Sequence, residues 1–140
     1  MTQEDKELLL KDLCARLPYN PLVEYKGESY NVLGIAHGRL VLCKPFMSYT
    51  LKENPLVEEA KPYLFPLSSM TEEQQEEFDG IYADDMQVVA NNLKNRLDGK
   101  PYETNLGHYR HIDWLNANHF DYRGLIEKGL ALDATGLNIY

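Results

Sequence analysis

The residue types best suited to chemistry are three histidines and two aspartates in the last third of the chain. They are His108, His111, Asp113, His119 and Asp121. Imidazole and carboxylate groups together can bind a divalent metal ion or exchange protons in acid–base catalysis. On a helix, however, His108 and His111 share a face while Asp113 projects elsewhere, so three ligands do not converge. We therefore predict no metal site, and a small hydrolase or transferase that uses one His/Asp pair remains an alternative function.

A second group combines aromatic rings with cationic side chains and suits binding rather than catalysis. Such groups recognise planar or anionic ligands and form the hot spots of protein interfaces. The chain has ten tyrosines against four phenylalanines, and tyrosine joins a rigid contact area to a hydroxyl that can bond a partner. The candidate binding residues are Lys61, Tyr63, Trp114, Tyr122 and Arg123. A structural explanation competes for two of them, because Arg123 can pair with an acid and Tyr122 can fill the core.

Signatures of the common enzyme classes are missing from the sequence. It has no glycine-rich dinucleotide or triphosphate loop, no metalloprotease helix motif, no nucleophile elbow and no Cys-x-x-Cys pair. Ser68, Ser69 and Thr71 precede a predicted helix, whose free amides could hold a phosphate. The glutamates in the first two turns of that helix repel an anion, so helix capping explains these hydroxyls better. We predict no catalytic residue and no cofactor.

The balance of charge restricts the partners. The chain has 22 acidic and 14 basic residues and a formal net charge of −8, which disfavours non-specific binding to nucleic acid or anionic membranes. No long apolar run follows the acidic start of the chain, so neither a signal peptide nor a membrane-spanning helix is expected. Cys14 and Cys43 lie in apolar surroundings and are expected to be buried free thiols. These features predict a cytoplasmic protein.

An N-terminal helix and a β-meander are predicted to open the fold. Thr2-Gln-Glu-Asp5 is a capping box, and Pro18 ends the helix that follows it. One face of this helix is apolar through Leu9, Leu10, Leu13, Cys14 and Leu17. Alternating apolar residues then predict three antiparallel strands near residues 22–26, 30–35 and 40–43.

The second half is predicted to be mostly helical after an irregular connector. The connector covers residues 44–70 and contains four prolines. A capping box at Thr71-Glu-Glu-Gln74 starts two helices, or one kinked helix, that reach residue 97. Further helices are expected near residues 105–118 and 122–128, the last capped by Asp121, before a strand at residues 130–133.

Together these elements predict a single α+β domain of residues 1–140. A small antiparallel β-meander packs with the N-terminal helix and a mostly helical C-terminal half. The apolar stripe from Phe78 to Leu97 suits either the core or the seam of a homo-oligomer.

Three blocks of the sequence resemble a family of small proteins carried by gut bacteria and by their phages and mobile elements. The blocks are residues 12–19, 61–71 and 113–130. No function is known for this family, so the resemblance transfers no functional residues. It implies an accessory gene, and phage accessory proteins of this size are often inhibitors, partner-binding modules or proteins that sequester a host signalling nucleotide.

The favoured prediction is therefore a non-catalytic accessory binding protein of counter-defence type. It would capture a partner protein or sequester a small nucleotide-like ligand through the five binding residues named above. The alternatives are the His/Asp enzyme and a structural or adaptor subunit.

Overall fold

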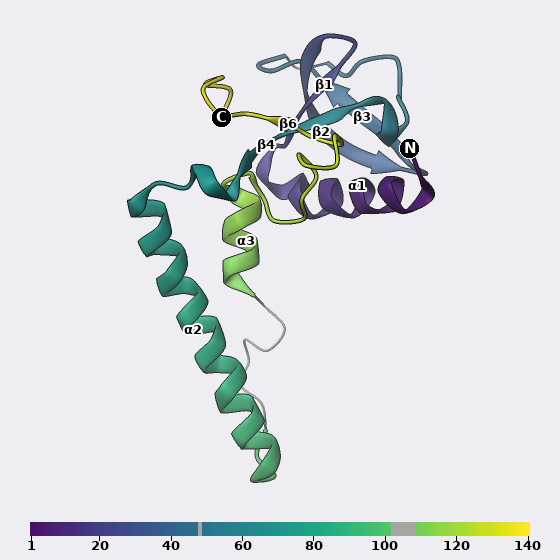
Figure 1. The fold of residues 1–140 in the computed structure, drawn as a ribbon. Coiled ribbons are helices and arrows are strands. Elements are labelled where there is room, and N and C mark those ends of the chain that lie inside the picture. Colours follow the sequence, from purple (N-terminus) through teal and green to yellow (C-terminus); the bar gives the residue numbers. More distant parts are fainter. Residues whose placement is uncertain (48, 102–108) are drawn as a thin grey trace. The chain divides into compact units, whose positions relative to one another are not determined.

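The computed structural model describes residues 1–47, 49–101 and 109–140 (Figure 1). The described residues form an α+β fold, as predicted, whose mixed sheet of six strands has the order β3-β2-β1-β4-β5, with β6 also paired to β4. The chain divides into two compact units. Residues 1–69 and 116–140 form the sheet unit, and residues 70–115 form the helical unit.

The predicted meander is confirmed in the sheet unit. Strands β1 (Leu22–Tyr25), β2 (Glu28–Ala36) and β3 (Arg39–Cys43) pair antiparallel in sequence order. The two turns between them, Lys26-Gly27 and His37-Gly38, have positive φ at both residues. This is the type I′ geometry that matches the twist of paired strands, and it fixes the register of both hairpins.

The prediction of an irregular connector at residues 44–70 is wrong for part of that segment. It contains β4 (Lys61–Pro66), which pairs antiparallel with β1 and parallel with the two-residue strands β5 (Phe120–Asp121) and β6 (Leu132–Asp133). Its prolines argue against a central strand, because proline cannot donate a ladder hydrogen bond. The strand is nevertheless stable here because short partners need few such bonds. Two 3-10 helices, η2 (Val57–Glu59) and η3 (Leu67–Ser69), flank it.

Helix α1 (Gln3–Arg16) begins at the predicted capping box. The Thr2 hydroxyl accepts from the Asp5 amide at 3.1 Å, and the Asp5 carboxylate accepts from the Thr2 amide at 3.4 Å. The chain continues past Arg16 as a 3-10 turn, η1 (Leu17–Tyr19), and ends at Asn20 in the left-handed conformation. Helix α1 runs across one face of the sheet (Figure 1).

The buried face of α1 differs from the predicted one. Leu9 and Leu13 are fully buried, but so are Asp12 and Arg16, and Cys14 is exposed. The prediction of a buried Cys14 was therefore wrong, because the helix is turned to bury a charged pair that a hydrophobic pattern does not reveal. Cys43 is buried as expected, and both thiols are free. The core joins α1 to the sheet and to the 125–131 segment through Leu9, Leu13, Val23, Tyr25, Tyr30, Val32, Leu40, Leu42, Val57, Ala60, Leu64, Leu125, Leu130 and Ala131.

The helical unit holds α2 (Glu72–Leu97) and most of α3 (Arg110–Ala117). The capping box at Thr71 is confirmed, since its hydroxyl accepts from the Gln74 amide at 3.1 Å. Two helices or one kinked helix were expected here, and the structure shows one continuous helix of 26 residues. The predicted start of the next helix, residues 105–108, lies outside the described residues.

The predicted helix at residues 122–128 is wrong, because the structure has a turn there. Asp121 does cap this turn, accepting from the amides of Leu125 at 3.0 Å and Ile126 at 2.9 Å. Gly124 has positive φ inside the predicted helix and interrupts it, while Gly129 closes the turn with positive φ, as expected. In the described part of the chain, no helix combines the length and apolarity needed to cross a membrane.

Candidate binding pocket

The five predicted binding residues are divided between the two units, with four in the sheet unit and Trp114 in the helical unit. Lys61 is exposed on β4, and Tyr63 lies two residues further along the same strand, half-buried. Trp114 belongs to the helical unit and packs against Phe78, with ring centroids 5.7 Å apart. Tyr122 and Arg123 are in contact, with the Arg123 guanidinium carbon 4.7 Å from the Tyr122 ring centroid.

A buried ionic network accounts for the position of Tyr122 and Arg123. The carboxylate of Asp12 accepts from Arg16 at 2.9 and 3.0 Å and from Arg123 at 3.0 Å. Arg16 also donates to the Phe120 carbonyl at 2.7 Å, and its guanidinium lies over the Tyr122 ring. Asp12 and Arg16 are fully buried. The network therefore fastens α1 to the 120–123 segment, which gives Arg123 a structural role.

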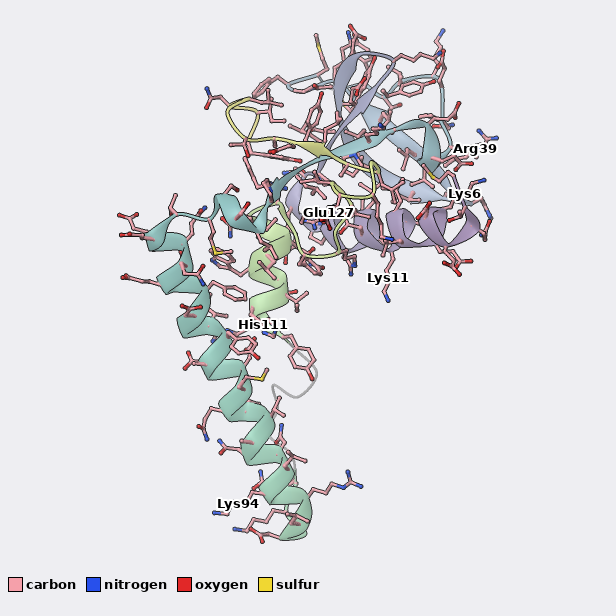
Figure 2. All side chains as sticks on the ribbon, in the orientation of Figure 1. Lys6, Lys11, Arg39, Lys94, His111 and Glu127 are labelled. Carbon is pink, nitrogen blue, oxygen red and sulfur yellow. The ribbon has the colours of Figure 1, made fainter. Side chains whose placement is uncertain are left out.

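The histidines of the sequence cluster lie in different surroundings. His108 is outside the described residues. The Nδ1 atom of His111 lies 2.6 Å from Asp85, not beside Asp113, and the His111 amide donates to the same Asp85 oxygen at 2.8 Å. Burial raises the pKa of Asp85, but these bonds outweigh it, so the pKa lies below its usual value. Asp85 thus caps the start of α3. Figure 2 labels His111 at this position.

The described residues contain no group of three or more His, Cys, Asp or Glu side chains placed to hold a metal ion.

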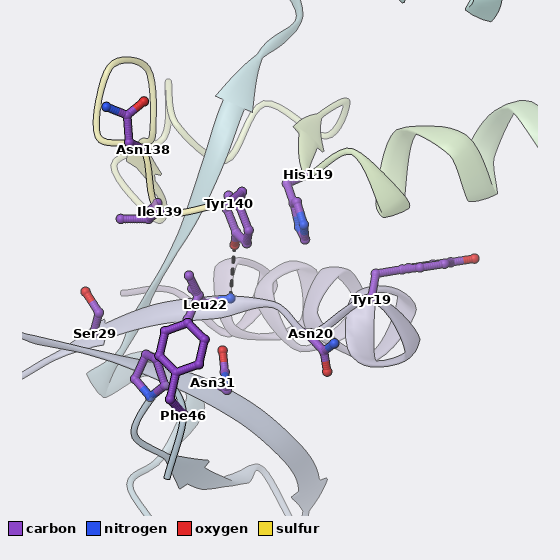
Figure 3. Close-up of a pocket in the computed structure, with 11 residues that line it drawn as sticks. Tyr19, Asn20, Leu22, Ser29, Asn31, Phe46, His119, Asn138, Ile139 and Tyr140 are labelled. Atoms are coloured by element: carbon purple, nitrogen blue, oxygen red, sulfur yellow. Dashed lines mark hydrogen bonds between the residues drawn. The ribbon is translucent and has the colours of Figure 1, made fainter.

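The sheet unit has a pocket of about 560 Å³ between η1, the starts of β1 and β2, the loop after β3 and residues 138–140 (Figure 3). It is lined by amide and hydroxyl groups, by rings and by aliphatic side chains: Asn20, Ser29, Asn31 and Asn138; Tyr19, Phe46, His119 and Tyr140; Leu22, Pro45 and Ile139. These eleven described residues include no Asp, Glu, Lys or Arg. The side chains that line the pocket are thus polar, aromatic or aliphatic, and none of them is an acid, a lysine or an arginine.

Backbone strain concentrates at this pocket. Asn20, Phe46, His119 and Asn138 all have positive φ, between 52° and 64°. They are four of the six non-glycine residues with positive φ in the described chain, and the other two lie in the type I′ turns. A left-handed backbone is costly for Phe and His in particular, and such strain tends to gather at ligand sites. Phe46 is also fully exposed, so no packing of its side chain offsets the energetic cost of its left-handed backbone.

His119 forms the inner wall of the pocket. Its side chain is only 8% exposed, and its ring stacks on Tyr140 with centroids 3.5 Å apart. Burial, together with the charge of Arg16, lowers the pKa of His119 to about 4, so the imidazole is neutral at pH 7. Its Nδ1 atom has no hydrogen-bond partner among the described residues.

Tyr140 pins residues 138–140 against the sheet. Its hydroxyl accepts from the Leu22 amide at 3.0 Å, as Figure 3 shows, and it donates to the Tyr63 carbonyl at 2.9 Å. Burial raises the pKa of Tyr140 to about 12. The hydroxyl is therefore protonated at all physiological pH values and serves as a fixed clamp.

Removing this clamp should loosen the pocket wall. The variant Tyr140→Phe keeps the stacked ring but leaves the Leu22 amide and the Tyr63 carbonyl without their partner. We expect the free energy of unfolding in urea to fall by about 1–2 kcal/mol. Tyr49→Phe is the matched control, since Tyr49 is 62% exposed and should lose nothing. Equal stability of both variants would show that the hydroxyl does not hold the wall.

A second, smaller cavity of about 290 Å³ lies beside Tyr25 and Tyr30. It is lined by lysines as well as tyrosines, the combination that a nucleotide needs. However, Lys26 is paired with Glu53 at 3.1 Å, and each tyrosine hydroxyl donates to a glutamate at 2.7 Å. The carboxylates make this cavity a poor site for an anion.

Sequence reasoning missed the pocket because five separate segments build it: residues 19–22, 29–31, 45–46, 119 and 138–140. The sequence placed His119 among the residues suited to chemistry, but it did not predict that His119 lines a pocket. Comparisons of the chain with protein-family models, with curated proteins and with solved structures gave no match.

Proposed function

We propose that the protein is a non-catalytic accessory binding protein that sequesters a small, uncharged, planar ligand of nucleobase type. The ligand would occupy the pocket beside His119 and Tyr140. The observation that carries the proposal is the concentration of left-handed backbone, including the costly Phe46 and His119, around a pocket whose aromatic and amide side chains carry no charge. Both thiols are free, which suits action in the reducing cytoplasm.

The absence of charge in the lining selects for a neutral ligand. A buried phosphate or carboxylate needs a cation or several aligned donors to replace its hydration. The described lining has neither Lys nor Arg, and His119 is neutral at pH 7 because its pKa is about 4. The net charge of −8 adds a repulsive field for anions. A nucleotide would therefore have to keep its phosphates in solvent, outside the pocket.

The types of lining group select for a planar, polar ligand. Tyr19 and Phe46 offer ring faces on which a heterocycle can stack. Asn20, Asn31 and Asn138 each offer a donor and an acceptor, which match the mixed edge of a nucleobase. The volume of about 560 Å³ lies inside the range of small-molecule sites.

A thermal-shift and calorimetry panel tests the proposal. It contains free nucleobases, their nucleosides and the matching 5′-monophosphates, each measured at pH 7 in the same buffer. At least one neutral compound should raise the melting temperature, and its monophosphate should bind about tenfold more weakly or worse. The proposal is wrong if no neutral compound binds, or if the monophosphate binds more tightly than its nucleoside.

The variant Phe46→Ala links any binding to this pocket. Phe46 is fully exposed, so truncation should leave the unfolding free energy unchanged while it removes a stacking surface. We expect the dissociation constant for the neutral ligand to rise about tenfold, as stacking on one ring is worth roughly 1–3 kcal/mol. Tyr49→Ala removes another exposed ring of the same segment that does not line the pocket, and calorimetry should find its affinity unaltered.

A further inference from the structure

We infer that a second copy of this chain docks antiparallel along α2, through a seam formed by Tyr82, Met86, Val89 and Leu93. The inference is independent of the ligand pocket, because the seam lies wholly within the helical unit.

Helix α2 has two lengthwise stripes with different exposure. The first repeats every three or four residues and is buried or half-buried within the protein: Gln74, Phe78, Ile81, Asp85, Val88, Asn92 and Asn95. The second is the seam, which is wholly apolar and includes two exposed side chains. Tyr82 is 45% exposed, although its ring also packs against Phe78 and His111. Leu93 is 58% exposed, while Met86 and Val89 are half-buried, like most of the first stripe. An exposed apolar stripe of this length on a surface helix is typical of an interface.

The spacing of the seam fits one antiparallel register. Its members follow each other at intervals of four, three and four residues, the pattern of the two inward positions of a heptad. About a twofold axis between Gln87 and Val88, Tyr82 faces Leu93 of the second copy and Met86 faces Val89. Each apolar layer thus joins unlike side chains, and the symmetry repeats every layer once on either side of the axis.

Charge along α2 selects the same orientation. The first half of the helix carries Glu72, Glu73, Glu76, Glu77, Asp79, Asp84 and Asp85, whereas its end and the residues after it carry three cations, Lys94, Arg96 and Lys100, and one acid, Asp98. In the antiparallel register the next layer beyond Tyr82 places Asp79 opposite Arg96 of the second copy. A parallel pair would set the acidic halves against each other. Figure 2 shows Lys94 near the end of α2 that would meet the acidic half of the second copy.

Analytical ultracentrifugation over a concentration series tests the pairing. The unchanged protein should form a dimer at micromolar concentration, and Leu93→Asp should sediment as a monomer over the same series. Leu33→Asp is the matched control, because Leu33 is a similarly exposed leucine (55%) of the sheet unit and its variant should dimerise normally. A monomeric unchanged protein at every concentration would overturn the inference.

Charge exchange tests the register. The single variants Asp79→Arg and Arg96→Asp should each weaken the dimer at least about tenfold, since each leaves like charges facing at both ends of the seam. The double variant restores opposite charges and should recover the affinity of the unchanged protein. Failure of the double variant to recover the dimer would contradict this register, whatever the cause of the single effects.

Cysteine cross-linking tests the orientation, in a background in which the exposed Cys14 is replaced by serine. In an antiparallel pair, Tyr82→Cys chains should link to Leu93→Cys chains when the two are mixed, and neither should link to itself. Equivalent positions would lie about 16 Å apart, too far for a disulfide. Self-linking of Tyr82→Cys alone would show parallel pairing and overturn the inference.

Discussion

Replacing Asp12 with alanine is expected to lower the free energy of unfolding by about 3–5 kcal/mol. Asp12 is fully buried and accepts hydrogen bonds from two arginines, Arg16 and Arg123. Removing the carboxylate leaves the buried guanidinium of Arg16 without a counter-charge. Because a domain of this size is stable by roughly 5–15 kcal/mol, the variant should lie close to the unfolding threshold.

Urea denaturation followed by circular dichroism measures this effect. The control is Lys6→Ala, which removes the partly exposed ion pair between Lys6 and Glu58 and should hardly change the midpoint. A variant at Asp12 as stable as the control would mean that the network does not hold α1 against the 120–123 segment.

The second expected result concerns acid pH and His119. The unfolded histidine titrates near its ordinary pKa of 6.5, whereas burial lowers the folded pKa to about 4. Above pH 6.5 the His119 imidazole is neutral in both the folded and the unfolded protein, so its protonation does not change the free energy of unfolding. As the pH falls from 6.5 towards 4, the unfolded chain binds a proton that the folded protein does not, so stability is lost. The loss should reach about 2 kcal/mol after allowance for partial solvent screening.

The variant His119→Asn isolates this effect. Asparagine tolerates the positive φ of this position and does not titrate, so the difference between pH 7 and pH 4 should shrink by that amount. Comparing the two proteins across the pH series removes the contribution of the carboxylates, which both share. Parallel stability curves for the two proteins would refute the buried, neutral His119.

Local signals allowed much of the fold to be predicted. Both capping boxes, at Thr2 and Thr71, use contacts within four residues, and the meander follows from alternation and from glycine in its two turns. Strand β4 could not be recognised in the same way, because its prolines suggest a loop and its partners come from distant segments.

The site was harder to predict than the fold. The Asp12–Arg16 pair is separated by one helical turn and reads as a solvated surface pair, yet it is buried. Tyr122 and Arg123 were named as candidate ligand contacts, with an ion pair of Arg123 as the structural alternative, and the structure pairs Arg123 with Asp12. The pocket depends on left-handed residues such as Asn20 and Phe46, and nothing in the local sequence specifies that conformation for phenylalanine.

The binding of a neutral planar ligand in the His119 pocket is tested most directly by NMR. The isotope-labelled protein is titrated with the nucleoside that gives the largest thermal shift, and the side-chain amide signals of its asparagines are followed. The account predicts saturable shifts at Asn20, Asn31 and Asn138, with the amides of Asn91 and Asn95 on α2 unchanged. Shifts confined to α2 or to the surroundings of Lys61, with the three pocket amides unmoved, would contradict it.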